Sequence, residues 1–173
     1  MRRAIADALI GNGKMLVCGN GGSAADAQHF AAEFVGRYRD NDRRALPVIA
    51  LGADTAFVTA WANDIGYDDV FARGVRAYSQ PGDVLVVIST SGRSKNVVAA
   101  MREAKALGLV TIALVGGALS PAVSLADIAI RVPSTDTARI QEVQTLALHL
   151  ICELVEARVL AHDALPRLEV AAR

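Results

Sequence analysis

Residues 15–33 of this chain read MLVCGNGGSAADAQHFAAE. An apolar run enters a glycine-rich turn, and the turn opens directly into a helix-like segment. Glycines let a ligand approach bare backbone, and the free N–H groups at a helix start attract anions. In the helix, His29 and Glu33 are four positions apart, so their side chains share one face. The stretch therefore predicts a strand, a ligand-binding turn and a helix that carries a polar pair.

Four further apolar runs predict the rest of a sheet. With the first run, at residues 15–18, they are residues 47–51, 84–89, 110–115 and 128–132. They are continuously apolar rather than alternating, as in parallel strands that are covered on both faces. Helix-like segments lie between them, at residues 23–36, 55–61, 69–78, 94–107, 120–126 and 137–161. This order predicts an α/β fold, a doubly wound five-stranded parallel sheet with helices on both faces.

Length and composition narrow the class of protein. The 173 residues are 53% hydrophobic, enough to bury one core, and 18 Lys and Arg balance 18 Asp and Glu. Balanced charge favours neither nucleic acid nor an anionic membrane as a partner. The amino end lacks the apolar stretch of a signal peptide, and no run is long enough to span a bilayer. We therefore expect one cytoplasmic domain over residues 1–173, with Cys18 and Cys152 as buried free thiols.

Two further segments, the last helix and the polar patch before the second strand, are expected to have structural roles. The last helix is predicted to face the core with Ile140, Val143, Leu146, Leu150, Leu154 and Val155. The polar patch at residues 39–44 is predicted to be a solvated loop before the second strand.

In doubly wound sheets, ligands bind beyond the carboxyl ends of the strands, where the strand order reverses. The turns after the first and third strands are therefore the expected site. The third strand is followed by a turn with four hydroxyl residues around Gly92: Ser89, Thr90, Ser91 and Ser94. One serine would indicate only a helix cap, whereas four hydroxyls at a helix start favour a phosphate monoester.

Two motifs have competing interpretations. Residues 19–24 match a dinucleotide fingerprint, but Asp54 is too far along the chain to be its acidic partner, so nicotinamide or flavin binding is not favoured. His29 and Glu33 could form a plain surface ion pair. They could also share a metal with Gln141 and His149, which interrupt the apolar last helix and need polar partners there.

Three stretches together resemble the phosphoheptose isomerases, which belong to the sugar isomerase (SIS) domain fold. They are residues 19–33, 89–94 and 134–143, and the resemblance extends over about residues 14–156. The run NGGSAADAQH at residues 20–29 is highly specific, whereas the Ser-Thr-Ser-Gly turn alone would indicate only a SIS domain. The resemblance implies a flavodoxin-like SIS domain and an aldose–ketose isomerase. Its reaction converts sedoheptulose 7-phosphate to D-glycero-D-manno-heptose 7-phosphate through an enediol, in heptose biosynthesis.

The resemblance also assigns site residues. It implies one zinc ion per active site, with His29, Glu33, Gln141 and His149 as ligands. Glu33 is implied as the base at C1, and His149 as its partner acid/base. Substrate contacts are implied for Asn20, Gly21, Gly22, Ser23, Glu33, Asn63, Asp64, Ser89, Thr90, Ser91, Ser94 and Gln141, with Arg37 as a further contact.

The spacing of these implied ligands predicts a shared site. Gln141 and His149 are eight residues apart, about 12 Å along a continuous helix, whereas zinc ligands lie about 2 Å from the ion. We therefore expect His29, Glu33 and Gln141 of one chain to be completed by His149 of a neighbour, in a homotetramer with active sites at subunit interfaces. The segment before the first strand is shorter than the helical region that the family usually carries there.

Two alternatives remain open. One is a non-catalytic SIS-domain regulator that binds a replication-initiation protein, against which the retention of Glu33 and His149 argues. The other is an isomerase or sensor for another phosphosugar. It is favoured by Arg93 and Lys95, which stand where such isomerases often carry Asn and Pro.

Overall fold

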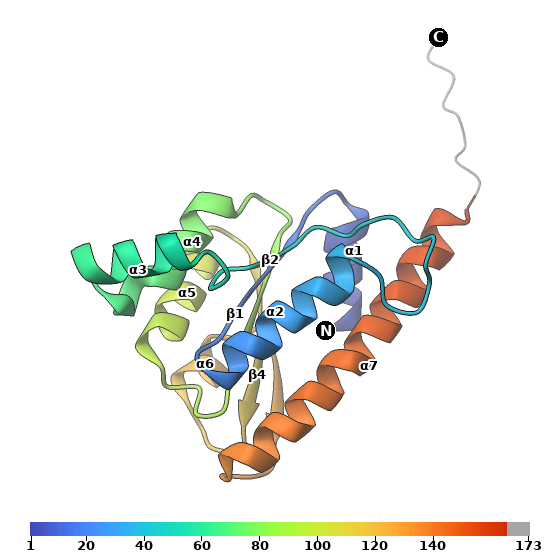
Figure 1. Cartoon of the computed structure of the whole chain (residues 1–173). Helices are drawn as coiled ribbons and strands as arrows, with labels where there is room; N and C mark the ends of the chain where they lie inside the picture. The colour runs from blue at the N-terminus through green and yellow to red at the C-terminus, as the bar shows by residue number, and fades with distance from the viewer. Residues whose placement is uncertain (166–173) are drawn as a thin grey trace.

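A computed structural model describes residues 1–165 and shows a parallel sheet between two layers of helices (Figure 1). The strands are β1 (Met15–Cys18), β2 (Val48–Ala50), β3 (Val84–Ser89), β4 (Val110–Gly116) and β5 (Ile128–Val132). Their order in the sheet is β2-β1-β3-β4-β5, and every pair of neighbours is parallel. The five predicted strands and the doubly wound α/β class are confirmed.

Each face of the sheet has its own helical layer and its own core. One face is covered by α1 (Arg2–Ile10), α2 (Gly22–Val35) and α7 (Thr137–Asp163). The other is covered by α3 (Thr55–Asp64), the 3₁₀ turn η1 (Tyr67–Asp69), α4 (Val70–Tyr78), α5 (Lys95–Ala106) and α6 (Pro121–Leu125). Within residues 1–165, none of the helices has both the length and the apolar character needed to cross a bilayer.

The central strands β1 and β3 have no solvent-facing side, which is why their sequences do not alternate, whereas the edge strand β5 exposes Ala129 and Arg131. In β1, Met15 and Val17 pack under the α2 and α7 layer, whereas Leu16 and Cys18 pack under the α4 and α5 layer. Successive side chains of a strand point to opposite faces, so both faces here are buried. All four β1 residues are almost completely inaccessible to solvent.

The prediction for α7 is wrong at four of its six apolar positions. Ile140 and Val155 are buried, but Val143, Leu146, Leu150 and Leu154 are 42–60% exposed. The face that packs on the core instead includes Gln144, Leu148, Ile151 and Cys152. The helix is therefore apolar on two sides, and only one of them meets this chain's sheet. We call the exposed row of Val143, Leu146, Leu150 and Leu154 the outer stripe.

The loop after α2 is also different from its prediction. Residues 39–44 were expected to be solvated throughout, but Arg43 is buried and pairs with Glu156 of α7. The sequence does not show that Arg43 is buried, because a single buried ion pair leaves no periodic pattern.

Candidate active site

The two predicted ligand-binding turns meet at the carboxyl edge of the sheet. Since β2 and β3 lie on opposite sides of β1, the strand order reverses there, and such a crevice is where doubly wound folds bind ligands. Each turn depends on a glycine in the left-handed region, with φ of 57° at Gly21 and 62° at Gly92. A Cβ at Gly92 would lie 2.9 Å from that of Ser120, so this turn has room only for glycine.

Asn20 is held in place between the two turns. Its amide exchanges hydrogen bonds of 2.9 Å with the amide of Asn96, and its Oδ1 also accepts from the Tyr67 hydroxyl at 2.8 Å. Asn96 Oδ1 accepts in addition from the N–H of Val97, in the first turn of α5. The Asn20 side chain is therefore oriented by Asn96 of α5 and Tyr67 of η1.

A pocket of about 180 Å³ opens beside the turn after β3. Its lining residues are Thr90, Ser91, Arg93, Gly117, Ala118, Ser134, Thr135, Thr137 and Ile140. The hydroxyls of this set come from two separate segments, residues 90–91 and 134–137, which gives the pocket side-chain donors on more than one side. Arg93 also lines it, although its guanidinium donates to the Leu119 carbonyl at 2.7 Å.

The four predicted phosphate hydroxyls divide into two groups. Thr90 and Ser91 line this pocket. Ser89 is buried behind the turn and its Oγ accepts from the Gly92 N–H at 3.0 Å, while Ser94 stands at the N-cap position of α5. Lys95 pairs with Asp68 at 3.1 Å, so its charge is directed at a carboxylate.

The polar pair on α2 meets α7 of the same chain. His29 Nε2 lies 3.0 Å from His149 Nε2, and His29 Nδ1 lies 3.7 Å from a Glu33 carboxylate oxygen. The Tyr38 ring stacks on His149, with 6.3 Å between centroids and 17° between planes. This contact contradicts the expectation that a neighbouring chain supplies the His149 that His29 meets.

The physical reason is that α2 and α7 run side by side in the same direction (Figure 1). Asp26 Oδ1 accepts from the Thr145 hydroxyl at 3.3 Å, between the His29–His149 contact and the start of both helices. At that start, a Cβ on Gly22 would lie 2.7 Å from the Gln141 Nε2, so the amide of Gln141 rests against the bare backbone. Gln141 and His149 are thus as far apart as predicted, but each meets a different turn of α2.

The predicted metal ligands are therefore brought together only in part. Two nitrogens on one tetrahedral zinc lie about 3.3 Å apart, given Zn–N distances of about 2.0–2.1 Å, so the His29 and His149 nitrogens are spaced much as ligands would be. Glu33 faces the other nitrogen of His29, and Gln141 lies at Gly22. Within residues 1–165, no three His, Cys, Asp or Glu side chains cluster as a metal site.

Asn63 and Asp64 lie apart from the histidines, at the end of α3. Their side chains hydrogen-bond each other at 2.8 Å, and α3 and α7 are on opposite sides of the molecule (Figure 1). In this part of the chain it is Tyr67 that reaches Asn20.

The two cysteines are free and buried, as predicted. Burial raises the pKa of the Cys18 thiol to about 12, and burial together with the Glu33 and Glu156 carboxylates raises the pKa of Cys152 to about 12. Both thiols stay protonated at neutral pH, and a thiol in that state is neither a good nucleophile nor a metal ligand.

Comparison with known proteins assigns this geometry to a family. Residues 2–116 match the SIS domain model. The phosphoheptose isomerase of Alteromonas mediterranea is 50% identical over 162 residues, covering 92% of this chain and 81% of that protein. The chain belongs to the phosphoheptose isomerases, within the SIS domain family.

Solved structures agree with this assignment. The phosphoheptose isomerase of Francisella tularensis superposes with a TM-score of 0.87 at 39% identity, covering 90% of this chain and 83% of that one. That of Neisseria gonorrhoeae gives 0.83 at 43% identity, covering 89% and 82%. The predicted family and the enzyme interpretation are confirmed, and they argue against the alternative of a non-catalytic regulator.

The candidate site includes residues that the sequence did not assign. They are Tyr38, Tyr67, Asn96, Ser134, Thr135 and Thr137. Residues 134–143 carried part of the family resemblance, so the hydroxyls at their start could have been suspected. Tyr38 and Tyr67 left no such signal, because the contacts that bring them to the site are long-range.

Proposed function

We propose that this isomerase interconverts sedoheptulose 7-phosphate and D-glycero-D-manno-heptose 7-phosphate in the cytoplasm. The observation that carries the proposal is the group of Glu33, His29 and His149 on two adjoining helices, in the same molecule as a hydroxyl-lined pocket at the strand ends. A phosphate bound there would supply binding energy far from the reacting carbons, and that energy fixes C1 and C2 for reaction.

The reaction needs a base at C1 and a group that moves protons between the two oxygens. We assign the base to Glu33, which takes the C1 proton and returns it to C2 through an enediol. His149 would shift the proton between O1 and O2. In the enzyme as described, His149 is already oriented by His29 on one side and by Tyr38 on a ring face.

Zinc is a further part of the proposal. His29 and His149 present two converging nitrogens that would hold the ion, and a bound zinc polarises a carbonyl as a Lewis acid. Nε2 of His149 cannot bind zinc and carry a proton at the same time. Zinc binding through this nitrogen and proton transfer by it are therefore alternatives. If the ion is required, we expect chelation to lower the activity and the addition of zinc to restore it. Full activity in a chelated enzyme shown by elemental analysis to be zinc-free would exclude that requirement.

The outer stripe of α7 supports assembly of several copies. Leu146 and Leu150 lie three residues before and one residue after His149, and their side chains are 60% and 50% exposed. A row of exposed leucines on one helix face is unfavourable in water unless another surface covers it. We propose that this stripe is covered by another copy in a homotetramer, which brings a neighbour close to the active site.

Turnover in D₂O tests the proposed reaction. Purified enzyme with sedoheptulose 7-phosphate should form the heptose phosphate, followed by NMR, with deuterium entering at C2 because the base exchanges its proton with solvent. Deuterium at C2 would establish proton transfer through an enediol, whereas product without deuterium would mean that the transferred hydrogen does not exchange with solvent, as in direct hydride transfer or transfer by a base shielded from water; no product would reject the substrate. A matched reaction with sedoheptulose lacking phosphate should be much slower.

A further inference from the structure

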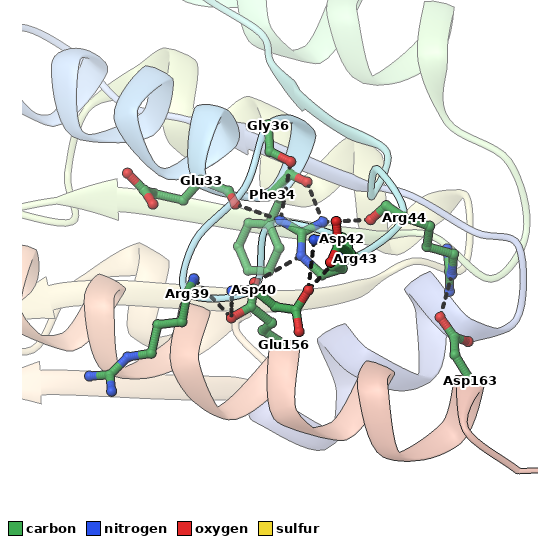
Figure 2. Close-up of polar contacts among 10 residues, drawn as sticks. All are labelled: Glu33, Phe34, Gly36, Arg39, Asp40, Asp42, Arg43, Arg44, Glu156 and Asp163. Atoms are coloured by element: carbon green, nitrogen blue, oxygen red, sulfur yellow. Dashed lines mark hydrogen bonds and ion pairs between the residues drawn. The ribbon is translucent and has the colours of Figure 1, made fainter.

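Arg43 is the most deeply buried charge in the loop between α2 and β2. Its side chain is 1% exposed, and its guanidinium donates to Glu156 Oε1 at 2.9 Å (Figure 2). The remaining donors reach backbone carbonyls, those of Phe34 at 2.9 Å, Glu33 at 3.0 Å, Gly36 at 3.5 Å and Arg44 at 2.7 Å. Every N–H group of the guanidinium is therefore used, in the planar fork that only arginine presents.

Three of these carbonyls belong to the end of α2. The last carbonyls of a helix have no partner within the helix, and a cation there also meets the negative end of the helix dipole. Arg43 thus caps α2 at the residue, Glu33, whose side chain we assign as the base.

Glu156 fixes the other half of the arrangement. Its second oxygen accepts from the N–H groups of Arg39 and Asp40, at 3.0 and 3.4 Å, so Glu156 ties this part of the loop to Arg43. It lies seven residues, or about two helical turns, beyond His149 on α7, and therefore on nearly the same face of the helix. The loop that it holds also carries Tyr38, which stacks on His149.

We propose that the Arg43–Glu156 pair is a positioning device for catalysis, which sets the end of α2 that carries Glu33 against the face of α7 that carries His149. This inference rests on the proposed roles of Glu33 and His149. The pair touches neither the hydroxyl-lined pocket nor a reacting group. Its loss should therefore slow the chemical step and leave phosphate binding unchanged.

The test is Arg43→Lys, with Arg44→Lys as the matched control. Lysine keeps the charge beside Glu156 but cannot bridge the helix carbonyls. Arg44 is the next residue and also pairs with α7, through Asp163 at 2.9 Å, but on the exposed surface. We expect Arg43→Lys to lower kcat on the order of 10- to 100-fold with KM unchanged, as misplacement by about 1 Å does. Arg44→Lys should change neither.

Imidazole NMR separates positioning from partial unfolding. The chain has three histidines, so three ring systems can be followed. In folded Arg43→Lys the His29 and His149 signals should move, while that of His162, near the end of α7, should stay. A loss of activity that only follows the unfolded fraction, with wild-type histidine signals in the folded protein, would overturn the proposal.

Glu156→Gln provides a second route if Arg43→Lys does not fold. Glutamine keeps an oxygen for the loop N–H groups and weakens the pair with Arg43, so the same kinetic and NMR changes are expected. Unfolding of both variants would show that the pair serves folding alone, which also rejects the proposal. The proposed catalytic roles are tested separately. If Glu33→Gln and His149→Ala retain activity, those roles are wrong, regardless of the result for Arg43→Lys.

Discussion

At the scale of single residues, the contact between His29 and His149 limits which protons the site can hold. Two Nε2 atoms at 3.0 Å cannot both carry a proton without repelling each other, so at least one ring accepts there. The Glu33 carboxylate on the opposite nitrogen of His29 favours a proton on Nδ1, which leaves Nε2 free to accept. This arrangement fits the proposed role of His149 as the ring that gives and takes a proton.

Glu33→Gln should abolish isomerisation and leave the fold and phosphosugar binding intact. Glutamine has the shape of glutamate but cannot take a proton from carbon, and acid–base catalysis contributes about 10²–10⁴-fold. Steady-state turnover and inhibitor binding by the same sample measure both effects. More than a tenth of wild-type activity would show that another group is the base.

Ser91→Ala should weaken binding of the phosphosugar much more than of its unphosphorylated analogue. Ser91 lines the pocket, and a hydrogen bond to a charged group contributes about 1.5–3 kcal/mol, or roughly 10- to 150-fold in affinity. Ser94→Ala should have a smaller effect, since Ser94 is outside the lining. Ser124→Ala, on α6, is the control. Equal losses for both sugars would assign the pocket to another ligand.

At the scale of elements, the parallel path of α2 and α7 decides which predicted residues meet. Gly22, Asp26 and His29 face Gln141, Thr145 and His149 in turn. The sequence shows both helices and the polar residues on them, but it does not show their relative direction, because that depends on how each packs on the sheet. This is why the family resemblance could list candidate ligand residues, whereas the structure places His149 beside His29 of the same chain and Gln141 beside Gly22.

Gly22→Ala should reduce activity without lowering stability. The new Cβ meets only the tip of the flexible Gln141 side chain, which moves away, so no backbone clash opposes the folded state. Gly21→Ala should instead lower stability. Nothing lies near its new Cβ, but its φ of 57° disfavours any side chain. Thermal melts and turnover of both variants measure this. If the effect acts through Gln141, Gly22→Ala should add nothing to Gln141→Ala.

At the scale of the whole molecule, the sheet was predictable and the second face of α7 was not. The five strands can be recognised in the sequence because each is mostly apolar, although β5 contains Arg131. On α7, apolar residues on two faces merge in the sequence into one hydrophobic helix. Only the sheet's position shows that Leu148 packs inward while Leu146 and Leu150 remain outside. The burial of Arg43 could not be predicted either, because nothing in the local sequence distinguishes it from the exposed arginines beside it.

The outer stripe and the separation of Gln141 from the histidines both bear on how copies of this chain would assemble. Within one chain, His29, Glu33 and His149 form one group, and Gln141 is more than two helical turns from His149. If Gln141 serves the histidine group, it must therefore come from another copy, and a copy packed on the outer stripe would be close enough to supply it.

Subunit mixing tests this arrangement. Glu33→Gln and Gln141→Ala chains, each much less active than wild type alone, should regain part of the lost activity when mixed, because some sites combine an intact Glu33 with a neighbour's Gln141. Glu33→Gln and His149→Ala chains should not, because both groups belong to one chain's site and no combination restores it. Exchange must first be verified by native mass spectrometry. Recovery in the second mixture but not the first would return His149 to the neighbouring subunit and reject the contact on which the proposed site is built.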